Sequence, residues 1–530
     1  MPGFYKDTPA MTIINATHIK SILDIKVYFA PMIYNQKPDF FFVYIILCTD
    51  GSFYTGITDD LVKRYKDHKY GLYNNCKIAA ELKYYETVPI LADATERQLE
   101  IAAWNHTEKL AFIQSNPHEM PLLDICNEIK ITPNPQINTQ KPVKKAGILG
   151  GGQLGRMLLQ AAANYPVETF VMENDAECPA AHLCHHFIKG DITNFDDVFN
   201  FGKDLDALTI EIESVNEEAL FKLESEGVKI FPSPAALKII KDKVLQKQFY
   251  KDNEIPTSDF LITKSLAELK RQENFLPAVH KIGLGGYDGR GVQVMRTKED
   301  MLKGFDSESV FEKMVDIKKE IAVMVAVSQT GEISIYPAVD MVFDQRLNLL
   351  EYQVSPADLH EKILWKIEAI AMKVVKHLKS PGLFAVELFV DKADQVWVNE
   401  TAPRVHNSGH HTIEANFSSQ FDMLWRIILG YPLGSTDHIL PAAIVNLLGA
   451  EGHTGDACYQ GLSEILQLEN VFVHIYGKKQ TKPGRKMGHI TIVSKERQEL
   501  IHQANRIKQT VKVISEAGMG NNQESIVNSR

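Results

Sequence analysis

The sequence predicts a multidomain protein of mixed α/β and α+β class, preceded by a small α/β module. Three observations support this prediction. A strand, a glycine-rich turn, a helix and a second strand follow one another over residues 146–174, which is the order of a βαβ unit. Two apolar strands enclose a second glycine-rich loop at 283–291. Five prolines between 117 and 142 indicate a partly extended linker between the module and the rest.

Composition restricts the class of protein. The 530 residues are 45% hydrophobic and 23% charged, which excludes overall disorder. With 57 basic and 67 acidic residues the net charge is −10, so a general nucleic-acid binder is not expected, although a local basic face stays open. The apolar run at 40–48 is far shorter than the roughly 20 residues of a membrane helix. Six cysteines without C-x-x-C spacing and no signal-peptide pattern predict a cytoplasmic protein.

The module begins with a predicted β-hairpin. Apolar residues at 41–48 and 53–58 flank the turn Thr49–Ser52, and this pattern favours two antiparallel strands. Asp59 or Asp60 can cap a helix that runs to about residue 69. A second helix is expected from about 95 to 114.

The large part begins with Gly150-x-Gly152-x-x-Gly155 between a strand and a helix that runs from Gln153 to about Asn164. Glycines and a helix N-terminus together favour an anion, and Glu173 stands where a Rossmann fold holds a ribose. A dinucleotide oxidoreductase is therefore one alternative; a phosphate site or a plain tight turn is another. Further strands are expected at 463–467, 471–477 and 489–494.

A second glycine-rich loop follows an apolar stretch that ends at Lys281. A strand–loop–strand layout is typical of a flexible hairpin that covers phosphates, with the lysine as a point charge. A surface hairpin with a flexible tip is the alternative, but four glycines in seven residues favour function. The loop residues are Gly285, Gly286, Tyr287, Asp288, Gly289, Arg290 and Gly291.

Two glutamates face each other in a predicted hairpin. Apolar residues alternate over 384–390, Asp391 to Asp394 form a turn, and a strand returns over 396–400. If Val390 faces Trp397, then Glu387 faces Glu400 with Cβ atoms about 4.5–5.5 Å apart. Mg²⁺ is the simplest reason for such a pair, with Asn399 as a further oxygen. A shared proton or another register is the alternative.

Polar residues gather in two further loops. The segment 401–411 combines Arg404, His406, Asn407, Ser408 and His410, which is typical of a substrate-binding wall. Near the C-terminus, Lys478, Lys479, Lys482, Arg485 and Lys486 lie within nine residues. This basic cluster fits a phosphate anchor, a nucleic-acid patch or a solvated face.

Five motifs in one order decide between these alternatives: GGGQLGRM, GGYDGRG, the E…NE pair, NETAPRVHNSGH and YGK…PGRKMGH. Over about 144–520 the chain resembles the N5-carboxyaminoimidazole ribonucleotide synthases, which are ATP-grasp ligases of purine biosynthesis. The resemblance implies a Rossmann-like pre-ATP-grasp sub-domain, an ATP-grasp sub-domain and a small C-terminal sub-domain. It also implies Mg²⁺-dependent carboxylation of 5-aminoimidazole ribonucleotide by ATP and bicarbonate through carboxyphosphate, in a homodimer.

The resemblance also implies roles for residues of this sequence. ATP would be bound by Lys243, Lys281, the loop Gly285–Gly291, the hinge residues Glu312, Lys313, Met314 and Val315, and also Glu320, Asn399 and Glu400. Glu387 and Glu400 would ligate the metal. Tyr287, Asp288, Arg290 and Lys281 would act in catalysis. The ribonucleotide would be bound by Gly152, Gln153, Leu154, Arg404, His406, Asn407, Ser408, Lys478 and Arg485.

The small module resembles a GIY-YIG endonuclease domain. The matching residues are Tyr44, Tyr54, Arg64 and His68. Gln98 stands where that family has a metal-binding glutamate, and a neutral amide lacks the carboxylate's charge. Residues 39–116 hold eight basic and eleven acidic side chains. We therefore expect a degenerate nuclease with at most weak nucleic-acid binding; the alternative is a DNA-processing nuclease that uses the ATP-grasp half as a scaffold.

The expected domain organisation follows from the linker and the two resemblances. The ranges are an extension at 1–35, the module at 36–117, a linker at 118–143, the pre-ATP-grasp domain at 144–254, the ATP-grasp domain at 255–435, the C-terminal domain at 436–520 and a tail at 521–530.

Overall fold

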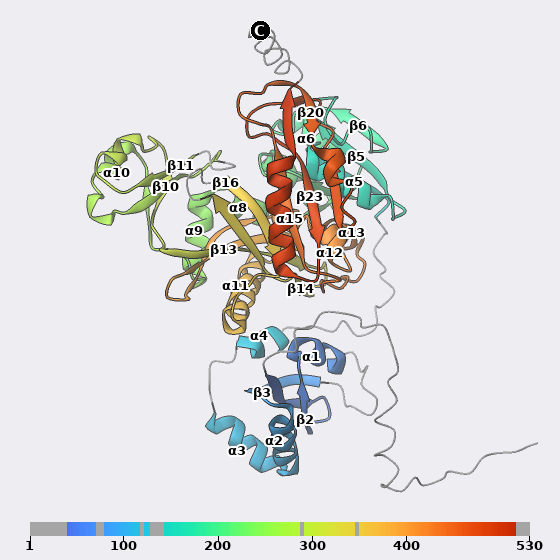
Figure 1. Cartoon of the computed structure of the whole chain (residues 1–530), viewed down its shortest axis with the longest axis vertical. Coiled ribbons are helices and arrows are strands. Elements are labelled where there is room, and N and C mark those ends of the chain that lie inside the picture. The colour runs from blue at the N-terminus through green and yellow to red at the C-terminus, as the bar shows by residue number, and fades with distance from the viewer. Residues whose placement is uncertain are drawn as a thin grey trace, which may run out of the picture. The chain divides into compact units, whose positions relative to one another are not determined.

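The structure is a computed structural model, and it describes residues 40–69, 79–116, 121–127, 143–286, 291–344 and 349–515. Figure 1 shows the helices and strands coloured along the chain. The described strands form five sheets, one in the N-terminal module and four in the rest of the chain. No helix in these ranges is long and apolar enough to cross a membrane.

The N-terminal module is a three-stranded antiparallel sheet between two pairs of helices (Figure 1). Strand β1 (Phe41–Cys48) is central, with β2 (Phe53–Thr58) and β3 (Ala79–Val88) on either side. Both faces of β1 are buried, because Tyr44 packs toward α1 and α4 while Ile45 packs toward α2 and α3. The helices are α1 (Leu61–Lys69), α2 (Leu91–Ala103), α3 (His106–Ser115) and α4 (Pro121–Asn127).

Local signals explain which predictions for the module are confirmed. The hairpin β1–β2 forms as expected, and Asp60 Oδ1 accepts a hydrogen bond from Lys63 N at 2.9 Å at the start of α1. The single helix expected over 95–114 is wrong. The backbone is extended at Trp104, and Asn105 begins α3 in a capping box with Glu108.

The predicted linker is in part helical, because α4 lies inside it. Asn127 of α4 uses its side-chain amide to accept from Leu82 N at 2.5 Å and to donate to Leu82 O at 2.9 Å. This pair of bonds fixes α4 to β3, a strand that the sequence analysis did not predict. The alternation of buried Leu82 and Tyr84 with Glu81 and Lys83 was the available signal.

A five-stranded parallel sheet follows, in the order β6-β5-β4-β7-β8. The predicted βαβ unit is confirmed as β4 (Lys145–Leu149), α5 (Gln153–Ala162) and β5 (Glu168–Glu173). Strand β4 is the central strand, so the glycine-rich turn lies where the strand order changes direction, which is the usual ligand site of such sheets. The remaining elements are β6 (His186–Lys189), α6 (Phe195–Gly202), β7 (Ala207–Ile210), α7 (Glu217–Ser225), β8 (Lys229–Phe231) and α8 (Pro234–Lys241).

A small antiparallel sheet in the order β11-β10-β12-β9 carries the second glycine loop. Its core is formed by Ala278, Met295 and Phe311 together with Leu269 and Met301. The elements here are α9 (Lys243–Asp252), β9 (Phe260–Thr263), α10 (Leu266–Lys270), β10 (Ala278–Ile282), β11 (Val292–Met295) and β12 (Ser309–Lys313).

The largest sheet has nine strands and runs without a break from the ATP-grasp region into the C-terminal region. Its order is β18-β17-β13-β15-β16-β19-β23-β21, and β14 pairs with β13. The strands are β13 (Ile317–Val327), β14 (Ile333–Ile335), β15 (Val339–Asp344), β16 (Leu349–Ser355), β17 (Gly382–Asp391), β18 (Val396–Ala402), β19 (Ala442–Leu448), β21 (Val471–Ile475) and β23 (Lys486–Val493).

Helices cover this sheet through alternating apolar residues. Helix α11 (Glu361–Leu378) packs on β13 and β17, and α13 (Gln420–Leu429) buries Trp425 against α5. Helix α15 (Arg497–Thr510) lies against β19 and β23 (Figure 1). A third small sheet joins β20 (Gly455–Gln460), β22 (Gln480–Thr481) and β24 (Lys512–Ser515).

Two of the three strands expected near the C-terminus are confirmed as β21 and β23. The strand expected at 463–467 is wrong, since residues 462–465 form the short helix α14 (Leu462–Ile465). Gly461 before it has φ +74°, a left-handed conformation that ends strand β20 and turns the chain.

Candidate active site

The two glutamates expected to bind a metal face each other in the β17–β18 hairpin. Glu387 pairs with Glu400 in the antiparallel register. The register that led to this prediction is wrong by one residue, because Val390 faces Val396 and Trp397 faces Phe389. A β-bulge between Glu387 and Leu388 restores the pairing. The extra residue is Asn399, which is partly exposed like Glu400. β-Bulges are common next to active sites, where they change the direction of a side chain.

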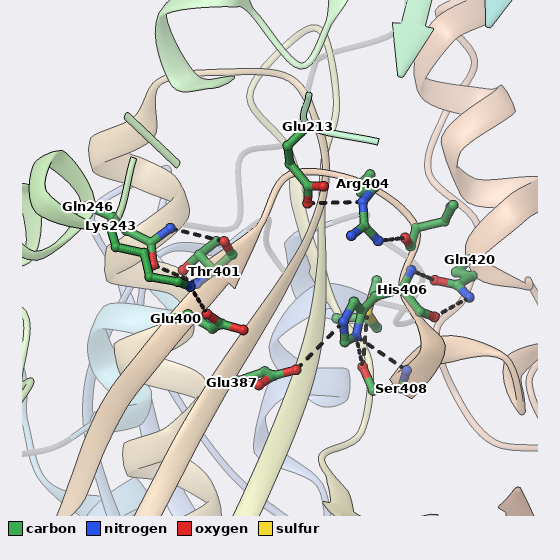
Figure 2. A network of polar contacts seen from close by, with 12 residues as sticks. Glu213, Lys243, Gln246, Glu387, Glu400, Thr401, Arg404, His406, Ser408 and Gln420 are labelled. Atoms are coloured by element: carbon green, nitrogen blue, oxygen red, sulfur yellow. Dashed lines mark hydrogen bonds and ion pairs between the residues drawn. The ribbon is translucent and has the colours of Figure 1, made fainter. Parts of the chain in front are cut away.

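The pair is electrostatically unequal. Burial and the neighbouring Glu400 raise the pKa of Glu387, whereas Lys243 holds the pKa of Glu400 well below its usual range. Lys243 Nζ lies 2.5 Å from Glu400 Oε2 (Figure 2). The Glu387 side chain is 20% exposed and that of Glu400 is 40% exposed. Without a cation the pair therefore favours one proton on Glu387, and a divalent cation would remove that need.

The two lysines expected to bind phosphate, Lys243 and Lys281, both contact strand β18. Lys281 Nζ donates to Asn399 Oδ1 at 2.8 Å and forms an ion pair with Glu312. Lys247, one helical turn after Lys243 on α9, binds Glu312 at 2.6 Å from the other side. Burial alone would raise the pKa of Glu312, but Lys281 and Lys247 together lower it to about 2.

Lys247 was missed by the sequence analysis. The i, i+4 spacing of lysines in KDKVLQK was the available signal, since such residues share one helix face. The Glu312 carboxylate is occupied by its two lysines, and Lys313 Nζ donates to the carbonyls of Phe275 and Leu276. The side chains of Glu312 and Lys313 are therefore both bonded to other groups of the protein.

Glu320 lies at the same site. It belongs to β13, opposite Phe389 of β17, and its charge contributes to the raised pKa of Glu387. Burial raises the pKa of Glu320 itself to about 7, with Lys281 opposing the shift. Four carboxylates and three lysines thus converge where Lys281 of the small sheet contacts Asn399 of the large sheet.

The glycine loop has the predicted strand–loop–strand layout. Lys281 of β10 pairs with Val292 of β11 in an antiparallel register. Gly285 and Gly291 have φ of +83° and +82°, and a Cβ on Gly291 would lie 2.5 Å from Ile282 Cγ2. Both positions therefore require glycine. Four loop residues lie outside the described ranges, namely Tyr287, Asp288, Gly289 and Arg290.

The polar loop after β18 lies next to the facing glutamates Glu387 and Glu400 (Figure 2). His406 Nε2 lies 3.6 Å from Glu387 Oε1, and its Nδ1 contacts Ser408 Oγ at 2.9 Å. Ser408 is fully buried, so this contact fixes the orientation of the His406 ring. Asn407 Oδ1 is buried and has no hydrogen-bond partner among the described residues, and Arg404 Nε lies 3.0 Å from Glu213 Oε1.

Two amides of the turn at the start of the large part are bonded to carboxylates of the chain. Gly151 N donates to Glu173 Oε2 at 3.2 Å, and Gly152 N donates to Glu211. A Cβ on Gly152 would lie 2.2 Å from Glu211 Oε1. The carboxylate expected to hold a ribose is thus bound to the loop itself. This geometry disfavours the oxidoreductase alternative.

The predicted anion loop joins β21 to β23 and lies near the parallel sheet. Lys478 Nζ donates to Lys486 O at 2.8 Å and Arg485 Nη1 donates to Gln480 O at 2.6 Å. Lys479 forms an exposed ion pair with Glu177, which follows β5. The basic cluster therefore contacts the segment after β5 of the parallel sheet.

Comparisons with known proteins agree with this geometry. Family models match a ribonucleotide synthetase preATP-grasp domain at 143–241, an ATP-grasp domain at 248–421 and a phosphoribosylaminoimidazole carboxylase C-terminal domain at 442–503. The N5-carboxyaminoimidazole ribonucleotide synthase of Synechococcus elongatus is 34% identical over 362 residues, which cover 66% of this chain and 90% of that protein. The chain belongs to the N5-carboxyaminoimidazole ribonucleotide synthase family.

Solved structures and a longer relative complete the comparison. The synthetase of Thermotoga maritima is 39% identical with a TM-score of 0.66, covering 70% of this chain and 100% of that one. A synthase from Aspergillus clavatus in complex with ADP and 5-aminoimidazole ribonucleotide is 30% identical with a TM-score of 0.63 and covers 69% of this chain and 99% of that one. The chloroplastic phosphoribosylaminoimidazole carboxylase of Vigna aconitifolia is 38% identical over 360 residues, which cover 66% of this chain and only 63% of that protein.

Two acidic residues of the candidate site were missed by the sequence analysis. Glu211 and Glu213 follow β7 and reach the glycine turn and Arg404 respectively. Burial raises the pKa of Glu211 to about 7, which the Gly152 amide opposes. The segment TIEIES covers the carboxyl end of strand β7 and the residues after it. This end of a strand next to β4 was the available signal.

The N-terminal module matches the GIY-YIG catalytic domain model over residues 40–113. Tyr44 OH lies 2.9 Å from His68 Nε2, and the rings of Tyr54 and His68 are 4.7 Å apart. Gln98 reaches the same strand region, because its Nε2 donates to Thr55 O at 3.2 Å. The two motif tyrosines and the histidine thus lie together, and Gln98 binds the backbone of β2 at Thr55.

Proposed function

We propose that this synthase carboxylates 5-aminoimidazole ribonucleotide with bicarbonate and ATP, giving N5-carboxyaminoimidazole ribonucleotide, ADP and phosphate. The observation that carries the proposal is the contact between two parts of one site. Lysines and facing carboxylates suited to a metal nucleotide adjoin the polar loop through His406, 3.6 Å from Glu387. The Aspergillus clavatus relative, which binds ADP and the ribonucleotide, supports this assignment.

The chemistry proceeds in two steps. A bicarbonate oxygen attacks the γ-phosphorus of ATP, ADP leaves, and carboxyphosphate forms. The N5 amine then attacks the carboxyl carbon, phosphate leaves, and the amine loses a proton. Lys243 and Lys281 would neutralise phosphate charge and position the nucleotide. A Mg²⁺ ion held by Glu387 and Glu400, with Asn399 beside them, would supply further charge neutralisation at the phosphates.

The remaining roles follow from the same proposal. The backbone at Glu312–Val315 would read adenine and Glu320 the ribose. The glycine loop, with Tyr287, Asp288 and Arg290, would cover the phosphates and exclude water from carboxyphosphate. The ribonucleotide would be held by Gly152, Gln153, Leu154, Arg404, His406, Asn407, Lys478 and Arg485, with Ser408 acting through His406. We also propose a cytoplasmic homodimer with the domain ranges 144–254, 255–435 and 436–520.

The experiment measures ADP formation by the full chain with Mg-ATP and bicarbonate, with and without the ribonucleotide. Strong stimulation by the ribonucleotide is expected, and Glu400→Gln should remove it. Lys392→Ala is the matched control, because Lys392 forms only an exposed ion pair with Asp316. Absence of stimulation in folded wild-type protein would refute the proposed reaction.

For the N-terminal module we propose a degenerate nuclease with at most weak nucleic-acid binding. Gln98 binds the backbone of Thr55 in β2, whereas Glu100 is exposed and bound to Arg97, and Glu96 is exposed. No carboxylate of α2 is thus directed at the tyrosines as a metal ligand. A plasmid-nicking assay with Mg²⁺ should show no cleavage by the wild-type chain; cleavage that Arg64→Ala abolishes would support the DNA-processing alternative.

A further inference from the structure

Two buried glutamines, Gln246 and Gln420, contact the backbone of residues 401–406, the segment that joins Glu400 to the polar loop (Figure 2). The segment begins at Thr401 in β18, which is an edge strand of the large sheet. An edge strand has backbone N–H and C=O groups that no neighbouring strand pairs. Gln246 of α9 and Gln420 of α13 each supply one amide to this segment, at Thr401 and at His406 respectively.

Gln246 substitutes for a neighbouring strand at Thr401. Its Oε1 accepts from Thr401 N at 3.1 Å, and its Nε2 donates to Thr401 O at 3.1 Å. The second hydrogen of Nε2 goes to Ile240 O at 2.9 Å, and the Tyr250 hydroxyl donates to Oε1 at 2.9 Å. All hydrogen-bonding positions used here agree with one orientation of the amide, so the side chain is fixed. The residue it holds follows Glu400 directly.

Gln420 forms the same arrangement at His406. Its Oε1 accepts from His406 N at 2.8 Å, and its Nε2 donates to His406 O at 2.8 Å and to His410 Nδ1 at 3.0 Å. The side chain is completely buried. A Cβ on Gly409 would lie 2.6 Å from Gln420 Oε1, so the loop approaches the amide closely because residue 409 is glycine.

We propose that Gln246 and Gln420 are positioning residues that act on different substrates of the reaction, which rests on the proposed function. Gln246 fixes the strand beside Glu400, which serves the metal nucleotide. Gln420 fixes the backbone of His406, which belongs to the polar loop proposed to bind the ribonucleotide. Neither glutamine contacts a reacting group; each acts through one backbone residue. Displacements near 1 Å at a binding group are enough for large kinetic effects.

The test compares Gln246→Met and Gln420→Met, because methionine has a similar length and no amide. Gln246→Met should raise the KM for ATP by about tenfold or more and leave the KM for the ribonucleotide within about threefold. Gln420→Met should do the reverse. Gln503→Met is the matched control, since Gln503 is a buried glutamine on α15 that bonds only Glu499 among the described residues and should change neither KM.

A second measurement separates this inference from the proposed reaction. ADP affinity, measured by calorimetry with Mg²⁺ and without ribonucleotide, should fall about tenfold in the Gln246 variant and stay unchanged in the Gln420 variant. If the wild type forms no ADP in response to the ribonucleotide, the proposed reaction fails while this contrast still tests the assignment of Gln246. Where a methionine variant does not fold, the isosteric Gln→Glu variant replaces it. Equal shifts in both KM values, or equal loss of ADP affinity, would overturn the inference.

Discussion

Replacement of Glu387 by glutamine should stabilise the metal-free protein and abolish the proposed activity. Glu387 faces Glu400 across the hairpin, and burial together with that neighbour raises the pKa of Glu387. Two unit charges about 5 Å apart repel by roughly 3 kcal/mol at an effective dielectric constant of about 20. Lys243 and the 40% exposure of Glu400 reduce this, so we expect a net gain of about 1–2 kcal/mol from the substitution.

The assay is thermal unfolding in EDTA at about pH 5 and about pH 8.5. A carboxyl whose folded pKa is raised retains a proton that the unfolded chain has already lost above the ordinary glutamate pKa of 4.5. Wild-type stability therefore falls as pH rises from that value toward the raised pKa. Glu387→Gln escapes this loss, so its advantage should be small at pH 5 and reach a few degrees at pH 8.5.

Glu400→Gln is the paired control with the opposite sign. It removes the ion-pair partner of Lys243 and should lower the unfolding temperature, while both variants lose ribonucleotide-stimulated ADP formation. A Glu387→Gln protein that unfolds below wild type at pH 8.5, or whose shift is the same at both pH values, would show that the facing carboxylates do not repel each other in the apo enzyme.

Three further predictions concern other parts of the chain. Glu312→Gln should lower stability by about 3–5 kcal/mol, because it leaves two buried lysines without their shared partner; chemical denaturation measures this, and a loss below 1 kcal/mol would contradict it. Gly291→Ala should lower ADP formation at least tenfold and the free energy of unfolding by about 1–3 kcal/mol, because its φ of +82° and the 2.5 Å approach of a Cβ to Ile282 Cγ2 strain the glycine loop; unchanged turnover would contradict this. Gln98→Glu should introduce Mg²⁺-dependent plasmid nicking that Arg64→Ala removes; its absence would mean that more than the carboxylate has been lost.

The alternation of apolar residues predicted the hairpin that carries Glu387 and Glu400, but it did not predict the register of the two strands. Alternating apolar residues place Glu387 on one face, and the facing strand must bring Glu400 opposite. The assumed register was off by one residue, and the bulge at Asn399 compensated. A bulge depends on hydrogen bonds between strands, so a residue count along the chain does not reveal it.

Long-range partners were beyond sequence reasoning for a different reason. Glu211 and Gly152 are neighbours because β7 lies beside β4 in the parallel sheet, and Gln420 reaches His406 because α13 packs against α5. Each contact depends on the tertiary arrangement of elements that are separate in sequence. The helix break at Asn105, by contrast, is encoded locally in its capping box and could have been identified.

The unbroken large sheet has a consequence for a chain that is cut between α13 and β19. Strands β16 and β19 pair directly at Gln353–Ile444, and Arg497 and Lys508 of α15 form ion pairs with Asp340 and Glu351 on the ATP-grasp side. A protease nick near residue 436 should therefore yield two fragments that migrate together in gel filtration and separate only in denaturant. Separate elution of the fragments would show that this seam is weaker than its hydrogen bonds and ion pairs imply. Two co-expressed fragments should likewise reassemble one working enzyme.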